Sequence, residues 1–235
     1  MKRKHRKIDR RKTYYLMMDT ETANTFNTNG KLDASSAQVY DTGFAIVDKR
    51  GKVYEEYSLV NKDVWERREL MNSAYYANKI PQYQKGLEEG TREMSSTYQI
   101  RQVMRELCEA YQPRAIIAHN ARFDVAALNS TQRYMTGSKY RFFLPYGVPV
   151  WDTMKMAGQT ICKQKSYREW CAKNGYMTKN NQPRKTAEVL YKYISNRDDF
   201  VEAHTGLEDV RIEAAIFAHC MRQHKKMNPA LYGGR

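Results

Sequence analysis

The sequence lacks the features that mark zinc-stabilised, secreted or membrane-spanning chains. It has no CxxC pair, and its four cysteines are too widely spaced to suggest a structural zinc site. No apolar run approaches the roughly 18 residues of a membrane helix, and no apolar core follows the basic N-terminus as in a signal peptide. We therefore expect a soluble intracellular protein, cytoplasmic and without a membrane partner, whose thiols are reduced. These thiols are Cys108, Cys162, Cys171 and Cys220.

Acidic residues are scarce relative to basic ones. The chain has 26 Asp and Glu against 40 Lys and Arg, which gives a formal net charge of +14. Residues 1–12, MKRKHRKIDRRK, contain eight of the basic residues and one aspartate. Half of the excess therefore lies in a short segment and half on the rest of the chain. A basic arm on a basic body favours a polyanionic partner, nucleic acid first, over a tail that only aids solubility.

Long linkers and internal repeats are absent too, and 41% of the residues are hydrophobic. A chain of 235 residues is long enough for one domain with a substantial core. We expect a disordered basic tail at 1–12, one folded domain at 13–224 and a C-terminal tail at 225–235. Protein partners and oligomeric state are left open by the sequence.

Apolar runs predict five strands. The first three are joined in part by the turn DKRG and are expected to pair antiparallel, whereas the later, short apolar runs are expected to be central parallel strands. The five segments are 14–18, 38–47, 53–60, 114–118 and 148–151.

Helical patterns occupy most of the remaining chain. Residues 62–80 are rich in helix formers, residues 97–111 have helical spacing that Pro113 ends, and a helix follows the fourth strand. Further helices are expected at about 166–174, 186–195 and 207–224. The order of elements predicts an α/β domain with a mixed sheet.

Two carboxylates stand at the end of the first strand, in YYLMMDTETAN. Residues i and i+2 of a strand share a face, so Asp19 and Glu21 project together. Like charges so placed repel each other unless solvent, a basic partner or a metal ion compensates them. Carboxylate oxygens suit Mg²⁺ and Mn²⁺. Taken alone, however, the pair is best interpreted as a solvated strand end.

Two later segments place further polar groups beside strand ends and helix starts, where sites form in α/β sheets. AHNARFD puts Asp124 on the first turn of a helix, and HTGLED puts His204 five residues before Asp209. Without these companions, His204 would be interpreted as an ordinary loop histidine.

DTET, HNARFD and HTGLED together resemble the three motifs of the DEDDh, or DnaQ-like, 3′–5′ exonuclease superfamily. That superfamily includes the proofreading epsilon subunit of DNA polymerase III and ribonuclease T. The match spans roughly residues 13–224, and each motif lies on the expected element. TGFAIVD around Gly43 and the Asp152-Thr153 pair resemble further landmarks. The chain departs from the pattern at Ala23-Asn24, where the family often has Thr-Gly.

The resemblance implies a ribonuclease H-like fold, a five-stranded mixed sheet flanked by helices. It also implies two divalent cations, Mg²⁺ or Mn²⁺, held by Asp19, Glu21, Asp124 and Asp209. His204 would be the general base that activates water, since its ordinary pKa lies near working pH. All five residues would then be catalytic.

Residues near these motifs are expected to hold the 3′-terminal nucleotide. Phe26 and Phe123 are the aromatic candidates for stacking on its base, although core packing is favoured for Phe123. His119 is interpreted first as a histidine whose ring is already hydrogen-bonded, with contact to a phosphate as the alternative. The substrate-binding set is Thr20, Thr22, Ala23, Phe26, Asn120 and His119.

The expected function is a metal-dependent 3′–5′ exonuclease that releases nucleoside monophosphates, with single-stranded DNA 3′ ends as the favoured substrate. RNA 3′ ends with the same mechanism are the first alternative. A catalytically inactive nucleic-acid-binding module is the second. A stand-alone nuclease, as a virus or mobile element would encode, is the simplest setting.

Overall fold

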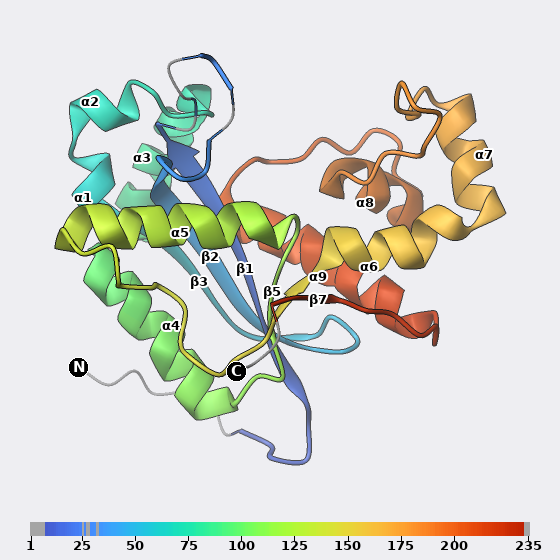
Figure 1. The fold of residues 1–235 in the computed structure, drawn as a ribbon, viewed down its shortest axis with the longest axis horizontal. Helices are drawn as coiled ribbons and strands as arrows, with labels where there is room; N and C mark the ends of the chain where they lie inside the picture. The colour runs from blue at the N-terminus through green and yellow to red at the C-terminus, as the bar shows by residue number, and fades with distance from the viewer. Residues whose placement is uncertain (1–7, 25, 27–28, 32, 233–235) are drawn as a thin grey trace.

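The computed structural model describes residues 8–24, 26, 29–31 and 33–232, and most of the predicted basic tail, residues 1–7, lies outside them. A sheet of seven strands forms the centre of the molecule, in the order β4-β3-β2-β1-β5-β6-β7 (Figure 1). The strands are β1 (Tyr14–Ala23), β2 (Gln38–Asp48), β3 (Val53–Asn61), β4 (Glu93–Ser95), β5 (Ile116–Ala118), β6 (Val150–Asp152) and β7 (Ala230–Tyr232).

The prediction of a mixed α/β fold is confirmed, but the prediction of five strands is wrong. The five expected strands are β1, β2, β3, β5 and β6, with antiparallel pairing from β1 to β3 and parallel pairing from β1 to β6. The two additional strands, β4 and β7, each have three residues and add to the two edges of the sheet. Strands this short carry too few residues for a period-two pattern.

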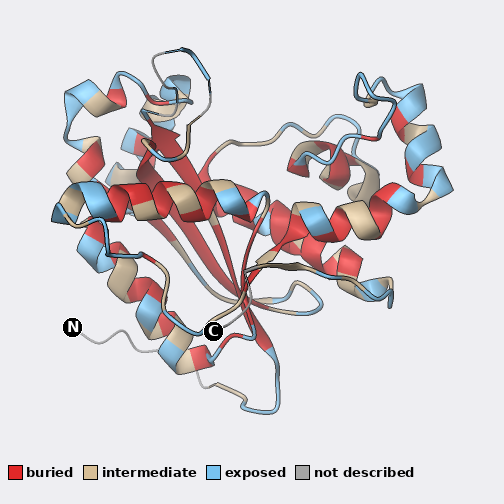
Figure 2. Cartoon of the chain, in the orientation of Figure 1, coloured by how far each residue is buried: buried red, intermediate tan, exposed pale blue. Residues whose placement is uncertain are grey.

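Helices cover both faces of the sheet, and β1 shows how the sequence distributes its side chains between them. Tyr14, Leu16 and Met18 pack in one core cluster with α4 (Thr97–Tyr111) and α5 (Ala121–Thr136). Tyr15 and Met17 pack in a second cluster with helices that include α9 (Gly206–Arg222). This alternation follows from the period of two in a strand and explains why β1 is almost wholly buried (Figure 2).

Most helices begin and end close to the predicted positions, and one segment differs. Residues 62–80 form short pieces, and the helix that follows them extends to Glu88. The additional helices of the domain are α1 (Lys62–Trp65), α2 (Arg68–Met71), η1 (Ala77–Lys79), α3 (Ile80–Glu88), α6 (Thr153–Gln159), η2 (Ile161–Lys163), α7 (Lys165–Lys173) and α8 (Ala187–Ser195). Within the described part of the chain, each helix is too short or too polar to cross a bilayer.

The segment from α1 to α3 packs as a cap over one end of the sheet. Its side chains form a third core cluster, in which Val64 and Tyr83 pack against Tyr40 of β2 and Ala23 of β1. The cap thereby brings the loop between α2 and η1 to the end of β1: the backbone N–H of Tyr75 donates to the carbonyl of Thr22 at 3.0 Å.

The start of α9 lies directly against β2. A Cβ atom added to Gly43 would meet the carbonyl carbon of Gly206 at 2.3 Å, so the two backbones approach as only glycine permits. Asp41 fixes the contact, because its Oδ2 accepts the N–H of Gly206 at 2.8 Å and the hydroxyl of Tyr83 at 2.7 Å. The first turn of α9 is thus held beside the end of β1.

Candidate active site

A cavity of about 300 Å³ opens where the end of β1, the start of α9 and the loop before α8 meet. Both ionisable and aromatic side chains line this cavity. No lysine or arginine is found among the described residues of its lining. The lining comprises Asp19, Thr20, Glu21, Thr22, Tyr75, Tyr76, His119, Phe123, Met154, Thr186, Ala187, Glu202, His204, Asp209 and Glu213.

Asp19 and Glu21 reach this cavity because they continue the alternation of β1. They follow Tyr15 and Met17 on the face that α9 covers, as the i, i+2 spacing predicts. Their carboxylate oxygens lie with one of Asp209 within 4.8 Å of one another. Three acids from two elements therefore converge on one point.

Asp209 is oriented by the turn that begins α9. Its Oδ2 accepts the backbone N–H of Thr205, the residue that precedes the helix, at 3.0 Å. Its Oδ1 is buried and has no hydrogen-bond partner. One oxygen is thus fixed by the fold and the other is left for a ligand.

Asp124 approaches from the other helix layer. Thr20 lies between Asp19 and Glu21 in β1 and therefore faces α5, where its hydroxyl donates to Oδ1 of Asp124 at 2.8 Å. Asp124 is buried, and its charge contributes to the raised pKa values of both Asp19 and Glu21. The structure thus brings Asp124 into the acidic cluster, although it is not part of the tight group of three. Thr20 holds this acid in place.

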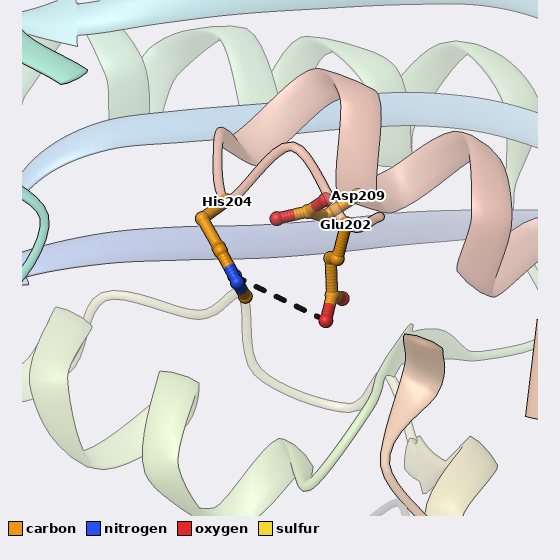
Figure 3. A group of neighbouring side chains, drawn as sticks. All are labelled: Glu202, His204 and Asp209. Carbon is orange, nitrogen blue, oxygen red and sulfur yellow. Dashed lines mark ion pairs between the residues drawn. The ribbon is translucent and has the colours of Figure 1, made fainter. Parts of the chain in front are cut away.

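His204 stands on the loop before α9, with a left-handed backbone (φ 53°). Its ring Nδ1 lies 3.9 Å from Oε2 of Glu202, and oxygen and nitrogen atoms of Glu202, His204 and Asp209 lie within 4.8 Å of one another (Figure 3). Burial is the largest cause that lowers the pKa of His204, followed by the charge of Lys79. The imidazole is therefore neutral at pH 7 and able to accept a proton.

Two acids of the cavity were missed from the sequence, Glu202 and Glu213. Glu213 is buried, accepts a hydrogen bond from the backbone of His119, and keeps Oε2 without a partner. It lies one helical turn after Asp209, and that i, i+4 spacing is the signal that could have found it. Glu202 stands in an irregular segment whose sequence offers no such signal.

The acids raise one another's pKa. Burial is the first cause for each of them, and neighbouring carboxylates are a further cause. The pKa of Asp124 is raised to about 7 and that of Asp209 to about 8. Burial likewise raises the pKa of Glu202 to about 7. The pKa values of Asp19, Glu21 and Glu213 are raised well above the ordinary range.

This donor set fits a divalent cation. Carboxylate oxygens converge, two of them are buried without a partner, and no basic side chain of the described lining neutralises them. Hard cations such as Mg²⁺ and Mn²⁺ prefer this type of ligand, and a buried anion needs compensation. The cluster therefore has the chemistry of a metal site.

His119 and Asn120 both form hydrogen bonds within the protein. The ring of His119 has partners on both nitrogens, Thr153 Oγ1 at 2.9 Å and the carbonyl oxygen of Lys185 at 2.7 Å. Because a carbonyl only accepts, Nε2 carries a proton and donates it to the carbonyl of Lys185, and burial lowers the pKa of the ring. The N–H of Asn120 donates to Asp152 Oδ1 at 3.1 Å, and Asn120 does not line the cavity.

The remaining expected substrate residues fall in different places. Thr22 and Phe123 line the cavity, and Phe123 is half-buried rather than part of the core. Ala23 is fully buried in the cap cluster, so its side chain faces away from the cavity. Phe26 is exposed and stacks on Tyr75, with ring centroids 5.7 Å apart, and reaches the cavity only through that ring.

Two aromatic residues from the cap complete the wall. Tyr75 and Tyr76 both line the cavity, and the ring of Tyr76 stacks on His204 with centroids 4.2 Å apart. Sequence reasoning assigned no role to this segment. An aromatic wall can stack on a base, and a cation held by the adjacent carboxylates would contact the phosphate.

Comparisons with known proteins give matches in structure alone: no protein-family model and no curated protein matches the sequence. A 3′-exonuclease that recognises the 3′ end of a histone mRNA stem-loop superposes with a TM-score of 0.61 and 10% identity, over 95% of this chain and 89% of that one. The nuclease domain of 3′hExo, described as a DEDDh family member bound to rAMP, gives 0.60 and 9%, over 95% and 100%.

A zinc-bound complex of E. coli ExoI with single-stranded DNA gives a TM-score of 0.55 and 16% identity, over 87% of this chain and 39% of that one. Identities at this level show a shared fold, and the chemistry has to be argued from the site. The resemblance expected from DTET, HNARFD and HTGLED is thus confirmed as a likeness of architecture. This chain has the fold of the DEDDh-family 3′-exonucleases.

Proposed function

We propose that this protein is a metal-dependent 3′–5′ exonuclease of the DEDDh superfamily. The observation that carries the proposal is the convergence of Asp19, Glu21 and Asp209 within 4.8 Å, with His204 beside them and no basic residue in the described lining. In support, the structures that share the fold include 3′-exonucleases. The reaction is hydrolysis of the terminal phosphodiester bond, which releases a nucleoside monophosphate.

The cations would be Mg²⁺ or Mn²⁺, two of them, held by Asp19, Glu21, Asp124 and Asp209. When bound, they would supply Lewis-acid stabilisation of the charge that develops on the phosphate oxygens and lower the pKa of a water molecule. Thr20 holds Asp124 and the turn at Thr205 holds Asp209, so the ligands are fixed before a cation arrives. Such preorganisation avoids rearrangement during the reaction.

His204 would act as general base. Its lowered pKa keeps the ring neutral at pH 7, and its place on a loop leaves it 31% exposed to solvent and substrate. After the ring takes the proton from water, the carboxylate of Glu202 at 3.9 Å would stabilise the imidazolium. A positioned general base contributes about 10²–10⁴ in rate.

The walls of the cavity would hold the last nucleotide. Tyr75 and Phe123 offer faces on which the terminal base can stack, and Phe26 extends that surface through Tyr75. Single-stranded DNA remains the proposed substrate. RNA is the second candidate, and the fold likeness to an exonuclease bound at an mRNA 3′ end favours testing it.

A degradation assay tests the function. Single-stranded DNA, duplex DNA and RNA, each labelled at the 5′ end, are incubated with Mg²⁺ or Mn²⁺ and with wild type, Asp19→Ala or His204→Ala protein. The proposal predicts a ladder that shortens from the 3′ end with wild type, and its loss with Asp19→Ala. A single internal cut, or undiminished degradation by folded Asp19→Ala protein, would overturn it. Glu88→Gln, an exposed acid on α3, is the matched control.

A further inference from the structure

A large groove lies on the α4–α5 face of the sheet. Its volume is about 1470 Å³, and it lies between α4, α5 and residues 137–149, the yellow-green segment that runs between these helices in Figure 1. Small-molecule pockets measure about 300–1,000 Å³. We call the hollow between these three segments the α4–α5 groove. Its size therefore suits part of a polymer better than a single metabolite.

The charge of this groove is positive. Arg101, Arg105 and Arg141 line it, and Glu109 is the one acidic side chain in the part of its lining that the structure describes. Burial lowers the pKa of Arg101 first, and then the charges of Arg105 and Arg141 lower it further. Arginines gathered in one groove attract an extended anion, such as a chain of phosphates.

Exposed aromatic rings line the groove. Tyr146 is 86% exposed, Tyr140 is 79% exposed and Phe142 is 56% exposed. Large apolar rings left in water at one place mark a binding surface. Rings interleaved with arginines are what unpaired bases use, because each base has a face that stacks without regard to sequence. Duplex DNA, whose bases are already stacked, gains nothing from them.

Basic residues continue from the groove along α5. A third hollow, of about 230 Å³, shares Val125 and Asn129 with the groove and is also lined by Arg122 and Arg133. The guanidinium of Arg133 lies 5.4 Å from the ring centre of Phe142, which ties this hollow to the groove. It also includes Arg122, which is next in sequence to Phe123 of the catalytic cavity. Arginines thus continue from the groove along α5 to the first turn of that helix, which also carries Phe123.

We propose that the α4–α5 groove binds single-stranded nucleic acid, several nucleotides away from the 3′ end that the catalytic cavity holds. Arginines would contact phosphates, and Tyr140 and Tyr146 would stack on bases. The direction of the strand, with its 5′ side in the groove and its 3′ end in the catalytic cavity, rests on the proposed exonuclease function. Binding of a strand in the groove does not depend on that function. The groove would make affinity depend on substrate length.

Binding of labelled oligonucleotides in EDTA tests the groove without catalysis. Fluorescence anisotropy is measured with DNA and RNA strands of about 4 and about 16 nucleotides, which span the site sizes of single-strand-binding folds. The variants are Arg105→Ala/Arg141→Ala and Tyr140→Ala/Tyr146→Ala, all exposed side chains. Arg101 is left intact because its Nε donates to the carbonyl of Phe143 at 3.0 Å.

The expected result is a loss of affinity for the long strand alone. Removing one aromatic ring that stacks on a base lowers the affinity for the strand about five- to 150-fold. Removing two phosphate contacts reduces the slope of log K against log salt by about 1.4. Lys165→Ala/Arg168→Ala on α7, with the same charge change on the other helix layer, should keep the wild-type affinity. Whichever of DNA and RNA binds more tightly identifies the natural strand.

Other outcomes would overturn the proposal. Long-strand affinity that the groove variants leave unchanged, or equal losses in the α7 control, would show that the groove binds no strand. Equal binding of duplex DNA would remove the role of the aromatic rings. If the groove variants lose long-strand binding and the wild type cleaves nothing with Mn²⁺, the groove stands and the exonuclease function fails. If the wild type cleaves and the groove variants bind the long strand as the wild type does, the exonuclease function stands and the groove proposal fails.

Discussion

The ring of Tyr76 lies flat against the imidazole of His204, with centroids 4.2 Å apart and planes 9° from parallel. Tyr76 belongs to the cap formed by α1–α3, and His204 belongs to the loop before α9, so the stack joins two segments far apart in the chain. Aromatic pairs in contact contribute about 0.5–1.5 kcal/mol beyond their buried area. The cap therefore positions the proposed general base.

Tyr76→Ala should reduce the rate of nucleotide release about two- to tenfold, the effect of losing a stack of that strength. Tyr76→Phe should keep the wild-type rate because the ring remains. Initial rates on a labelled single strand measure both variants. Tyr98→Ala, an exposed tyrosine of α4, serves as the control. A full rate for folded Tyr76→Ala would contradict a positioning role for the stack.

His204→Ala should lower the rate about 10²–10⁴-fold and change its dependence on pH. Because burial lowers the pKa of His204, the acidic limb of the wild-type profile should have its midpoint below 6.5. A pH–rate profile of wild type and variant checks this. An acidic limb that persists unchanged in His204→Ala would assign the titration to another group.

The contact between Gly43 and Gly206 should tolerate no side chain. Gly43→Ala places a Cβ atom 2.3 Å from the backbone of Gly206, and overpacking of this kind costs about 1–3 kcal/mol or more. We expect a lower melting temperature and loss of the acid–histidine geometry. Gly158→Ala on α6, where the nearest atom would be 3.5 Å away, should be neutral or slightly stabilising. Equal melting temperatures for the two variants would refute the close approach.

The metal-free protein should lose stability as the pH rises from about 6.5 to 8. Asp124, Asp209 and Glu202 have pKa values of about 7, 8 and 7 when folded, against about 4 when unfolded. Over this range the folded state binds more protons than the unfolded state, so unfolding becomes easier as pH rises. Histidines whose pKa burial lowers act in the opposite direction, because they still bind protons near pH 6.5 when unfolded, and their effect fades by pH 8.

Melting curves at several pH values, in EDTA and in Mn²⁺, check this dependence. The slope should be on the order of 1 kcal/mol per pH unit in EDTA, and Mn²⁺ should stabilise the protein more at pH 8 than at pH 6.5. A metal-free protein that is more stable at pH 8 would have the opposite sign and would show that the acids are compensated in another way.

Glu213→Gln should stabilise the metal-free protein at pH 8. The amide replaces an acid whose pKa is raised by burial and by neighbouring carboxylates, and so removes the cost of burying that acid at high pH, yet its oxygen still accepts the hydrogen bond from the backbone of His119. The melting temperature in EDTA should rise relative to wild type, and Glu88→Gln should leave it unchanged. A fall for Glu213→Gln would mean that the charge itself holds the fold.

The fold was largely predictable because its central strands contain apolar runs. Every residue of β5 is buried, and β1 alternates its side chains between two helix layers, so hydrophobicity alone marks them. The edge strands escaped prediction for the opposite reason: β4 has two exposed residues among its three. Capping and tertiary contacts determine where the short helices from α1 to α3 begin and end, and the hydrophobic periodicity of the sequence does not show these contacts.

The candidate site was predictable where spacing fixes geometry. The i, i+2 relation of Asp19 and Glu21 and the turn that begins α9 are local properties. Contacts across the chain, such as Tyr76 on His204, leave no local signal. The unusual Asn24 is now explained: it adopts φ 52°, a left-handed conformation that asparagine accepts more readily than most residues other than glycine. Its side chain donates to the carbonyl of Ser36 at 3.0 Å.

Calorimetric titration of Mn²⁺ into the metal-free protein tests the central claim most directly. The account predicts saturable binding to wild type, the same binding to Glu88→Gln, and its loss in Asp209→Asn, which keeps the acceptor for Thr205 but removes the charge at the convergence of the three acids. Wild-type protein that is folded and binds no Mn²⁺ would contradict it.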